Sequence, residues 1–203
     1  MNPEPPFWCL TPVEKRCLLR LAKDAIESAV NQCSLAPVCL EDLPPALSLH
    51  AASFVTLYRQ GSLRGCVGGL EPRMPLAEDV REHALMAALH DCRFEPVDPD
   101  ELPGLDIEIS VLSPTRRLEF ADPADLLARL RPTQDGVILT YGDRRGTLLP
   151  QVWKRIPDRV AFLGALCEKM GLDPCAWQTL KMSVFTYEVV EFSEAELQDA
   201  SPP

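Results

Sequence analysis

The sequence predicts an α+β fold with mostly antiparallel sheets, packing helices and two intimately joined subdomains. The first observation behind this prediction is the order of the expected elements: helix, hairpin, helix, strand, short helix, hairpin, helix, strand. A hairpin–helix–strand unit therefore occurs twice, which is typical of α+β domains, although the two halves are not alike enough to be called a sequence repeat. The second observation is composition, since 203 residues with 46% hydrophobic and 25% charged side chains can bury a sizeable core.

The first half of the chain predicts two helices around a hairpin. Thr11 is a good helix cap, Pro12 suits the first helical position, and Glu14 completes a capping box. The expected elements are a helix from Thr11 to about Cys33, a proline-rich loop over residues 34–49, strands at Ala51–Arg59 and Leu63–Leu70 around Gln60-Gly61-Ser62, and a helix at Leu76–His90.

The second half contains the strand with the clearest alternation. Leu105–Leu112 alternates apolar and polar residues, so Asp106, Glu108 and Ser110 are expected on one face. The other expected elements are a short helix from Asp122 to Leu130, strands at Val137–Tyr141 and Thr147–Leu149 around the turn Gly142–Gly146, a helix from Asp158 to Met170 that ends at Gly171, and a strand at Met182–Phe192.

This pattern places most of the chain in one domain. Residues 1–10 are expected to form a flexible arm, residues 11–192 a single domain with two subdomains, and residues 193–203 an acidic tail. The net charge of -10 argues against a nucleic-acid partner. No apolar run approaches the ~18 residues of a membrane span, and no signal peptide is recognisable. We therefore expect a cytoplasmic protein whose eight cysteines are mostly reduced.

One stretch concentrates the chemistry of the chain. Leu63–Leu70 holds a basic side chain, a thiol and three glycines within eight residues. Glycine permits backbone conformations and close approaches that a side chain would block, so Cys66, between Gly65 and Gly68, is expected to have space around its sulfur. The stretch fits neither the dinucleotide-binding fingerprint nor the phosphate-binding loop.

At this stretch the chain resembles the AMMECR-domain family. The similarity continues at Asp91-Cys92-Arg93-Phe94, where the family has Asp-Pro-Arg-Phe, and it extends from about Val13 to Phe192. The remaining matching segments are Leu105–Ser113, Asp135–Leu139, Arg145–Trp153 and the terminal strand. Several motifs in the family's order make this resemblance specific.

The resemblance implies an α+β fold of two closely joined parts. It also implies two partners, a Memo-like protein and a radical S-adenosylmethionine protein, which often accompany the family in bacteria and archaea. It names no reaction and no cofactor. Three positions depart from the family's pattern: Cys92 replaces a frequent proline, Gly69 a frequent threonine, and His83 stands where asparagine is expected.

Cys66 is the first candidate for catalysis. A nucleophilic cysteine needs a nearby cation or histidine, and Arg64 lies two residues away on the same expected strand face. His83 or His90 would act as the base and Glu108 or Asp106 as the acid, an arrangement suited to acyl transfer or hydrolysis. In the alternative interpretation Cys66 packs under a glycine turn and the histidines lie on a solvated helix.

A metal site and an anion site are the other candidates. Cys66, His83, His90 and Glu108 are suitable metal ligands, but their spacing has no signature, so no metal is predicted. The converging guanidinium groups of Arg64, Arg93 and Arg145 would bind an anionic ligand, with Trp153 lining the cleft. The alternative is that these arginines pair with carboxylates and that the tryptophan packs in a core.

Two functions follow from these candidates. In the first, the protein is an enzyme or enzyme component with a cysteine-containing cleft that acts on a small anionic metabolite. In the second, it is a non-catalytic binding or scaffold module that uses the Arg64–Gly69 motif as a recognition surface. An accessible Cys66 with polar groups close to its sulfur would favour the first.

Overall fold

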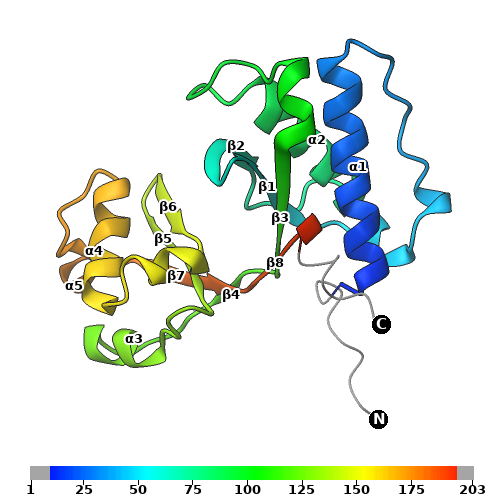
Figure 1. Cartoon of the computed structure of the whole chain (residues 1–203). Coiled ribbons are helices and arrows are strands. Elements are labelled where there is room, and N and C mark those ends of the chain that lie inside the picture. The colour runs from blue at the N-terminus through cyan, green and yellow to red at the C-terminus, as the bar shows by residue number, and fades with distance from the viewer. Residues whose placement is uncertain (1–9, 196–203) are drawn as a thin grey trace. The chain divides into compact units, whose positions relative to one another are not determined.

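The computed structural model describes residues 10–195 of the chain. These residues form two compact units, one built from residues up to Leu112 together with those from Val190 onward, the other from Ser113–Val189. Each unit contains a four-stranded antiparallel sheet, so the predicted α+β class is confirmed (Figure 1). The predicted arm lies almost wholly outside the described residues, as does most of the predicted acidic tail.

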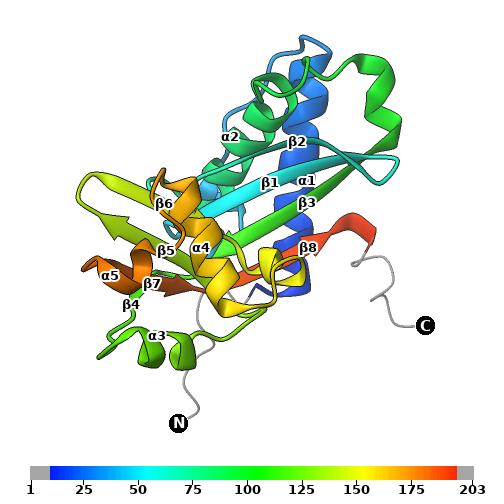
Figure 2. The same cartoon turned by 90° about the vertical axis from the view of Figure 1, so that its left-hand side faces the viewer.

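The first unit places two helices against one sheet. The sheet has the strand order β2-β1-β3-β8, and β1 is antiparallel to both β2 and β3. Figure 2 shows β3 lying between β1 and β8. The elements are α1 (Pro12–Val30), β1 (Ala52–Arg59), β2 (Ser62–Gly68), α2 (Leu76–Leu89), β3 (Leu105–Leu112) and β8 (Val189–Ser193), with short 3₁₀ helices at Leu40–Asp42, Pro45–Ser48 and Pro99–Gly104.

Strand alternation gives this sheet two different faces. Val55, Leu57 and Ile109 point to one side and are fully buried, in a core shared with the apolar faces of α1 and α2. The next residues along, Thr56 and Glu108, point to the other side because successive side chains alternate across a strand. One face therefore holds the core, and the opposite face carries the polar side chains.

Local signals in the sequence set the ends of these elements. Thr11 and Glu14 form the predicted capping box at the start of α1. Gln60 and Gly61 both have positive φ angles, 52° and 74°, which makes a two-residue hairpin turn of the kind that matches strand twist. The helix α1 ends at Val30, a little before the predicted end at Cys33.

The second unit repeats the arrangement with a smaller sheet of order β4-β7-β5-β6. Its core holds Trp153, whose indole stacks on the Phe162 ring with centroids 3.6 Å apart. Its elements are β4 (Arg116–Arg117), α3 (Pro123–Arg129), β5 (Gly136–Tyr141), β6 (Arg144–Leu148), a 3₁₀ helix at Pro150–Lys154, α4 (Arg159–Lys169), α5 (Ala176–Thr179) and β7 (Ser183–Tyr187).

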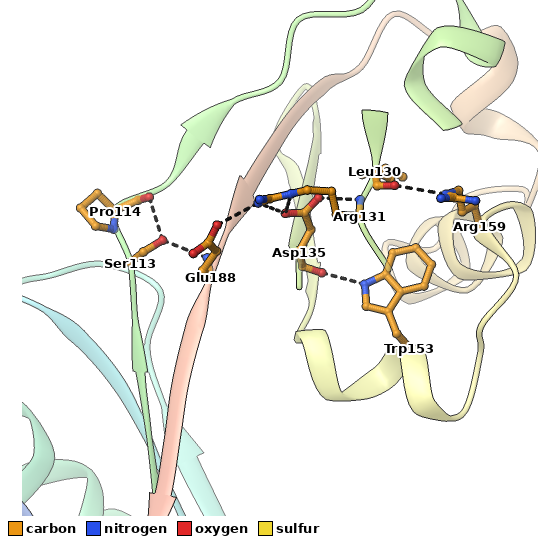
Figure 3. Close-up of polar contacts among 8 residues, drawn as sticks. All are labelled: Ser113, Pro114, Leu130, Arg131, Asp135, Trp153, Arg159 and Glu188. Carbon is orange, nitrogen blue, oxygen red and sulfur yellow. Dashed lines mark hydrogen bonds and ion pairs between the residues drawn. The ribbon is translucent and has the colours of Figure 1, made fainter. Parts of the chain in front are cut away.

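Two predicted strands were wrong in their limits. The single strand expected at Met182–Phe192 is two strands, β7 and β8, which belong to different sheets. The break lies at Glu188, whose N–H donates to Ser113 Oγ at 2.9 Å and whose carbonyl accepts from the Ser113 N–H at 2.8 Å (Figure 3). The strand expected to begin at Thr147 begins at Arg144, because Gly142 has a φ of 56° and the turn is tighter.

The two units share one strand topology. In each, the first hairpin strand pairs with its hairpin partner on one side and with the strand after the helix on the other, giving β2-β1-β3 and β6-β5-β7. The registers also correspond, since Leu57 lies opposite Gly65 and Leu139 lies opposite Gly146. The twofold hairpin–helix–strand order in the sequence is therefore a twofold topology in the structure.

Close packing of a helix on the sheet explains why glycine occupies both position 65 and position 146. A Cβ on Gly65 would collide with the Ala87 backbone carbonyl on α2, and one on Gly146 would lie 2.6 Å from Met170 Cγ. A carbonyl oxygen on a packed helix cannot rotate away, whereas the end of a methionine can.

We expect Gly65→Ala to lower the free energy of unfolding by roughly 1–3 kcal/mol, because α2 must move away from β2. Chemical denaturation would measure the change. Gly104→Ala is the matched control, since a Cβ there would meet no atom within 4 Å. Equal stabilities of the two variants would contradict the packing argument.

Candidate functional site

Cys66 lies in a row of polar side chains across three strands of the first sheet. Thr56 on β1 lies opposite Cys66 on β2 and opposite Glu108 on β3, so all three side chains share the face turned away from α1 and α2. The Thr56 hydroxyl donates a hydrogen bond to Cys66 Sγ at 3.4 Å. The expected common face of Asp106, Glu108 and Ser110 is confirmed by their pairing with Tyr58, Thr56 and Phe54.

The backbone of Cys66 is held at both of its polar groups by two side chains. Its N–H donates to Asp91 Oδ2 at 2.8 Å, and its carbonyl accepts from the Arg93 guanidinium at 3.2 Å. The side chains of Asp91 and Arg93 also bind each other through two hydrogen bonds, of 2.6 and 2.9 Å. Because β2 is the edge strand, this pair occupies the place that a neighbouring strand would take.

The charge state of this pair is well defined. The Arg93 guanidinium, hydrogen-bonded to Asp91, holds the pKa of that carboxyl group well below its usual range. The Asp91 side chain is also buried, at 5% exposure. The ion pair therefore favours the carboxylate form of Asp91, which accepts a hydrogen bond from the Cys66 backbone N–H.

Arg64 is bound to a second carboxylate. It donates two hydrogen bonds to Glu101, at 2.9 and 2.8 Å, and a third to the Pro96 carbonyl. The Phe94 ring lies close to both guanidinium groups, 6.0 Å from that of Arg64 and 5.4 Å from that of Arg93. Both arginines are thus paired with carboxylates, which is the structural alternative that the sequence left open for them.

Tyr58 and Glu108 add a further polar contact to the same face. Burial raises the pKa of the Tyr58 phenol, and the neighbouring Glu108 carboxylate, with which it is hydrogen-bonded, raises it further. The phenol therefore stays protonated and can donate to the carboxylate.

His83 belongs to a different cluster on the other side of the sheet. Its Nδ1 lies 3.1 Å from Asp79 Oδ2 and 3.4 Å from Ser53 Oγ, and Ser53 Oγ donates to Asp79 at 2.6 Å. Ser53 is three residues from Thr56 on β1, so its side chain points to the helix face. The structure therefore does not bring His83 to the thiol, and the expected Cys66–His83 pair does not form.

The comparisons with known proteins cover nearly the whole chain. The AMMECR1 family model matches residues 19–192. The chain belongs to the AMMECR1 family. A protein from Methanothermobacter thermautotrophicus is 38% identical over 186 residues, covering 89% of this chain and 94% of its own length. A protein from Thermococcus gammatolerans is 40% identical over 187 residues, covering 86% of this chain and 88% of its own length.

A solved structure of the same kind supports the fold. The crystal structure of an uncharacterised protein from Pyrococcus horikoshii matches with a TM-score of 0.78 and 35% sequence identity, over 90% of this chain and 91% of that one. None of these descriptions names an activity. Membership of the AMMECR1 family therefore establishes the fold, and a reaction has to be inferred from the geometry of the site.

Two of the three departures from the AMMECR1 pattern are neighbours in space. A Cβ at Gly69 would lie 3.7 Å from His83 Cε1 and 3.8 Å from His83 Nε2, so the imidazole packs directly over this glycine. A larger side chain at position 69 would extend toward the ring. The histidine and the glycine therefore form one packing unit, and neither touches Cys66 in the described contacts.

The glycines of the AMMECR1 motif serve packing. Gly65 faces the backbone of α2, and a Cβ on Gly68 would collide with the Phe54 ring. These glycines let the helix and an aromatic ring approach the edge strand, and neither leaves an open space for a ligand at its own Cα.

Arg145 and Trp153 belong to the second unit. Arg145 is exposed on β6, opposite Thr140. Trp153 is 1% exposed, and its Nε1 donates to the Asp135 carbonyl at 2.7 Å, beside the Arg131–Asp135 and Arg131–Glu188 ion pairs (Figure 3). These contacts are those of a tryptophan that packs in a core.

Metal and membrane features are absent from the described residues. Within residues 10–195, no group of three or more His, Cys, Asp and Glu side chains is placed to hold a metal ion. In the same range no helix combines the length and the apolar character needed to cross a membrane.

Sequence reasoning did not assign a role to Thr56, Tyr58, Asp91 or Glu101. Asp91 was part of a quoted motif, but only the fold shows that its carboxylate meets the Cys66 backbone. The sequence showed Thr56 only as one of several β-forming residues. The strand register is what places it opposite Cys66.

The Arg64–Glu101 pair predicts a pH dependence of stability. Hydrogen bonds from Arg64, with help from the Asp98 N–H, lower the pKa of Glu101 from its ordinary 4.5 to about 2. A lowered pKa in the folded state means that the stabilising contribution is fully present above pH 4.5 and is lost as the pH falls toward 2. We expect Glu101→Gln to reduce the free energy of unfolding by about 1.5–3 kcal/mol at neutral pH.

Denaturant unfolding across the acidic range would test this expectation. The difference between wild type and Glu101→Gln should shrink as the pH falls from 4.5 toward 2. Glu95→Gln, at an exposed position in the same segment, serves as the control. A difference that stays constant across this range would contradict the assignment.

Proposed function

We propose that this protein is an enzyme or enzyme component that acts on a small metabolite through the thiol of Cys66. The observation that supports this proposal best is the set of hydrogen bonds that hold Cys66 in place. Both backbone groups of Cys66 are bound by Asp91 and Arg93, and its sulfur accepts from Thr56. A catalytic group has to be held close to its productive geometry, and these hydrogen bonds hold the strand residue that carries the thiol.

The polar row suits acyl transfer or hydrolysis. The Thr56 hydroxyl donates to Sγ and so stabilises negative charge there. We assign Glu108, opposite Thr56 on the next strand, as the carboxylate that accepts the thiol proton. Sγ then bonds to an acyl carbon of the metabolite, and the bond from this carbon to its leaving group breaks as the proton returns to the leaving group. Water hydrolyses the thioester and restores the thiol.

The charge of the metabolite is not part of this proposal. An anionic substrate was expected because Arg64, Arg93 and Arg145 were candidates to bind it, and Arg145 lies in the other unit. The guanidinium groups of Arg64 and Arg93 pair instead with Glu101 and Asp91. The resemblance suggests a Memo-like protein and a radical S-adenosylmethionine protein as partners, and these are the proteins to include in the assay.

Replacement of the thiol separates catalysis from binding. We expect Cys66→Ser to abolish one specific product in a metabolite screen followed by mass spectrometry, while thermal unfolding and capture of the two partner proteins are unchanged. Cys33→Ser, at an exposed position in the same unit, is the matched control. Loss of partner capture without loss of a product would instead favour a binding or scaffold module that uses the Arg64–Gly69 motif.

The hydroxyl of Thr56 gives a second test that needs no substrate. We expect Thr56→Val to slow alkylation of Cys66 by iodoacetamide about tenfold, because one hydrogen bond to sulfur is lost. Peptide mass spectrometry would measure the rate at Cys66 and, in the same molecule, at the exposed Cys33. An unchanged ratio of the two rates would argue against an activated thiol.

A further inference from the structure

A second candidate site lies in the helical layer of the first unit. A hollow of about 430 Å³ opens between the C-terminal half of α1, the segment 34–38 and Arg81 of α2. This volume is in the range of small-molecule sites. The hollow lies on the side of the sheet that carries the helices, whereas Cys66 lies on the opposite face. It is therefore separate from the thiol and independent of the function proposed for Cys66.

Arg81 is the unusual residue of this hollow. The guanidinium groups of Arg64 and Arg93 are each bound by a carboxylate in the same unit. Arg81 is half-buried, and within residues 10–195 it makes no hydrogen bond or ion pair. A half-buried guanidinium without a partner is costly, and an anionic group of a ligand would compensate for it.

Two carboxylates line the same hollow without meeting Arg81. Asp24 and Glu27 project from α1, and among the described residues neither side chain forms an ion pair. Opposite charges that share one hollow but stay more than 4.0 Å apart leave room for a molecule with a charge at each end. Its cation would meet the carboxylates and its anion would meet Arg81.

The remaining walls suit the body of such a molecule. Leu21, Leu35 and Val38 supply apolar surface for a short carbon chain. The segment 34–38 also presents peptide groups, and in the part of the chain that the structure describes no backbone hydrogen bond involves these residues. Peptide groups without partners in the protein are free to bind water or a ligand.

From this geometry we propose that the hollow binds a small zwitterion, an amino-acid-like molecule whose carboxylate pairs with Arg81 and whose ammonium group pairs with Asp24 and Glu27. The apolar side chains contact the carbon chain between the two charges. Both charges of the ligand are required, because each is matched by a group that forms no ion pair within residues 10–195.

Isothermal titration of the full chain with ε-aminocaproate tests this proposal. Caproate and hexylamine are the matched half-ligands, each with one of the two charges. We expect each half-ligand to bind at least about tenfold more weakly than the zwitterion, since it loses one charge-assisted contact. The shorter γ-aminobutyrate would show whether the spacing of the two charges matters.

Two variants and one control assign the effect to the hollow. Arg81→Gln should weaken binding of ε-aminocaproate about tenfold or more, and Arg20→Gln, at an exposed position on α1, should leave it unchanged. If Arg81→Gln fails to fold in a thermal-unfolding scan, the double variant Asp24→Asn with Glu27→Gln removes the opposite end from exposed positions. No detectable binding at about 10 mM, or binding that neither variant weakens, would overturn the proposal.

Discussion

The ion pair between Asp91 and Arg93 is the interaction on which the geometry around Cys66 depends. It closes the edge of the first sheet by binding the N–H and the carbonyl of Cys66, and so it fixes the strand that carries the thiol. The hydrogen bonds of this pair are strong, because both groups are charged and Asp91 is buried. The Phe94 ring, next to Arg93, also lies near the guanidinium of Arg64, which pairs with Glu101.

The shared topology of the two units makes this edge easier to understand. Position 66 in β2 corresponds to position 147 in β6, and the Thr147 carbonyl accepts a hydrogen bond from Lys169 Nζ at 2.9 Å. A cation therefore covers the same edge carbonyl in both units, which protects each edge strand from pairing with another chain. The difference lies in the side chain, a thiol in one unit and a hydroxyl in the other, so only the first unit offers a strong nucleophile here.

The two faces of the first sheet carry different polar clusters. On the helix face, Ser53, Asp79 and His83 satisfy one another beneath α2, and Gly65 lets that helix approach the edge strand. On the opposite face, Thr56, Cys66 and Glu108 form the polar row. Because successive side chains of a strand point to opposite faces, a shift of one residue along the strand decides whether a polar side chain lies on the helix face or in the polar row.

The sequence by itself determined most of the longer helices and strands, because their signals are local. The capping box at Thr11, the turn at Gln60-Gly61 and the alternation of Leu105–Leu112 each depend on neighbouring residues. Motifs in the right order also determined the AMMECR1 family. Only the tertiary structure decided that Met182–Phe192 divides between two sheets, that His83 and Cys66 lie on opposite faces, and that Asp91 binds the Cys66 backbone. These are contacts between residues far apart in the chain, and no spacing rule in the sequence encodes them.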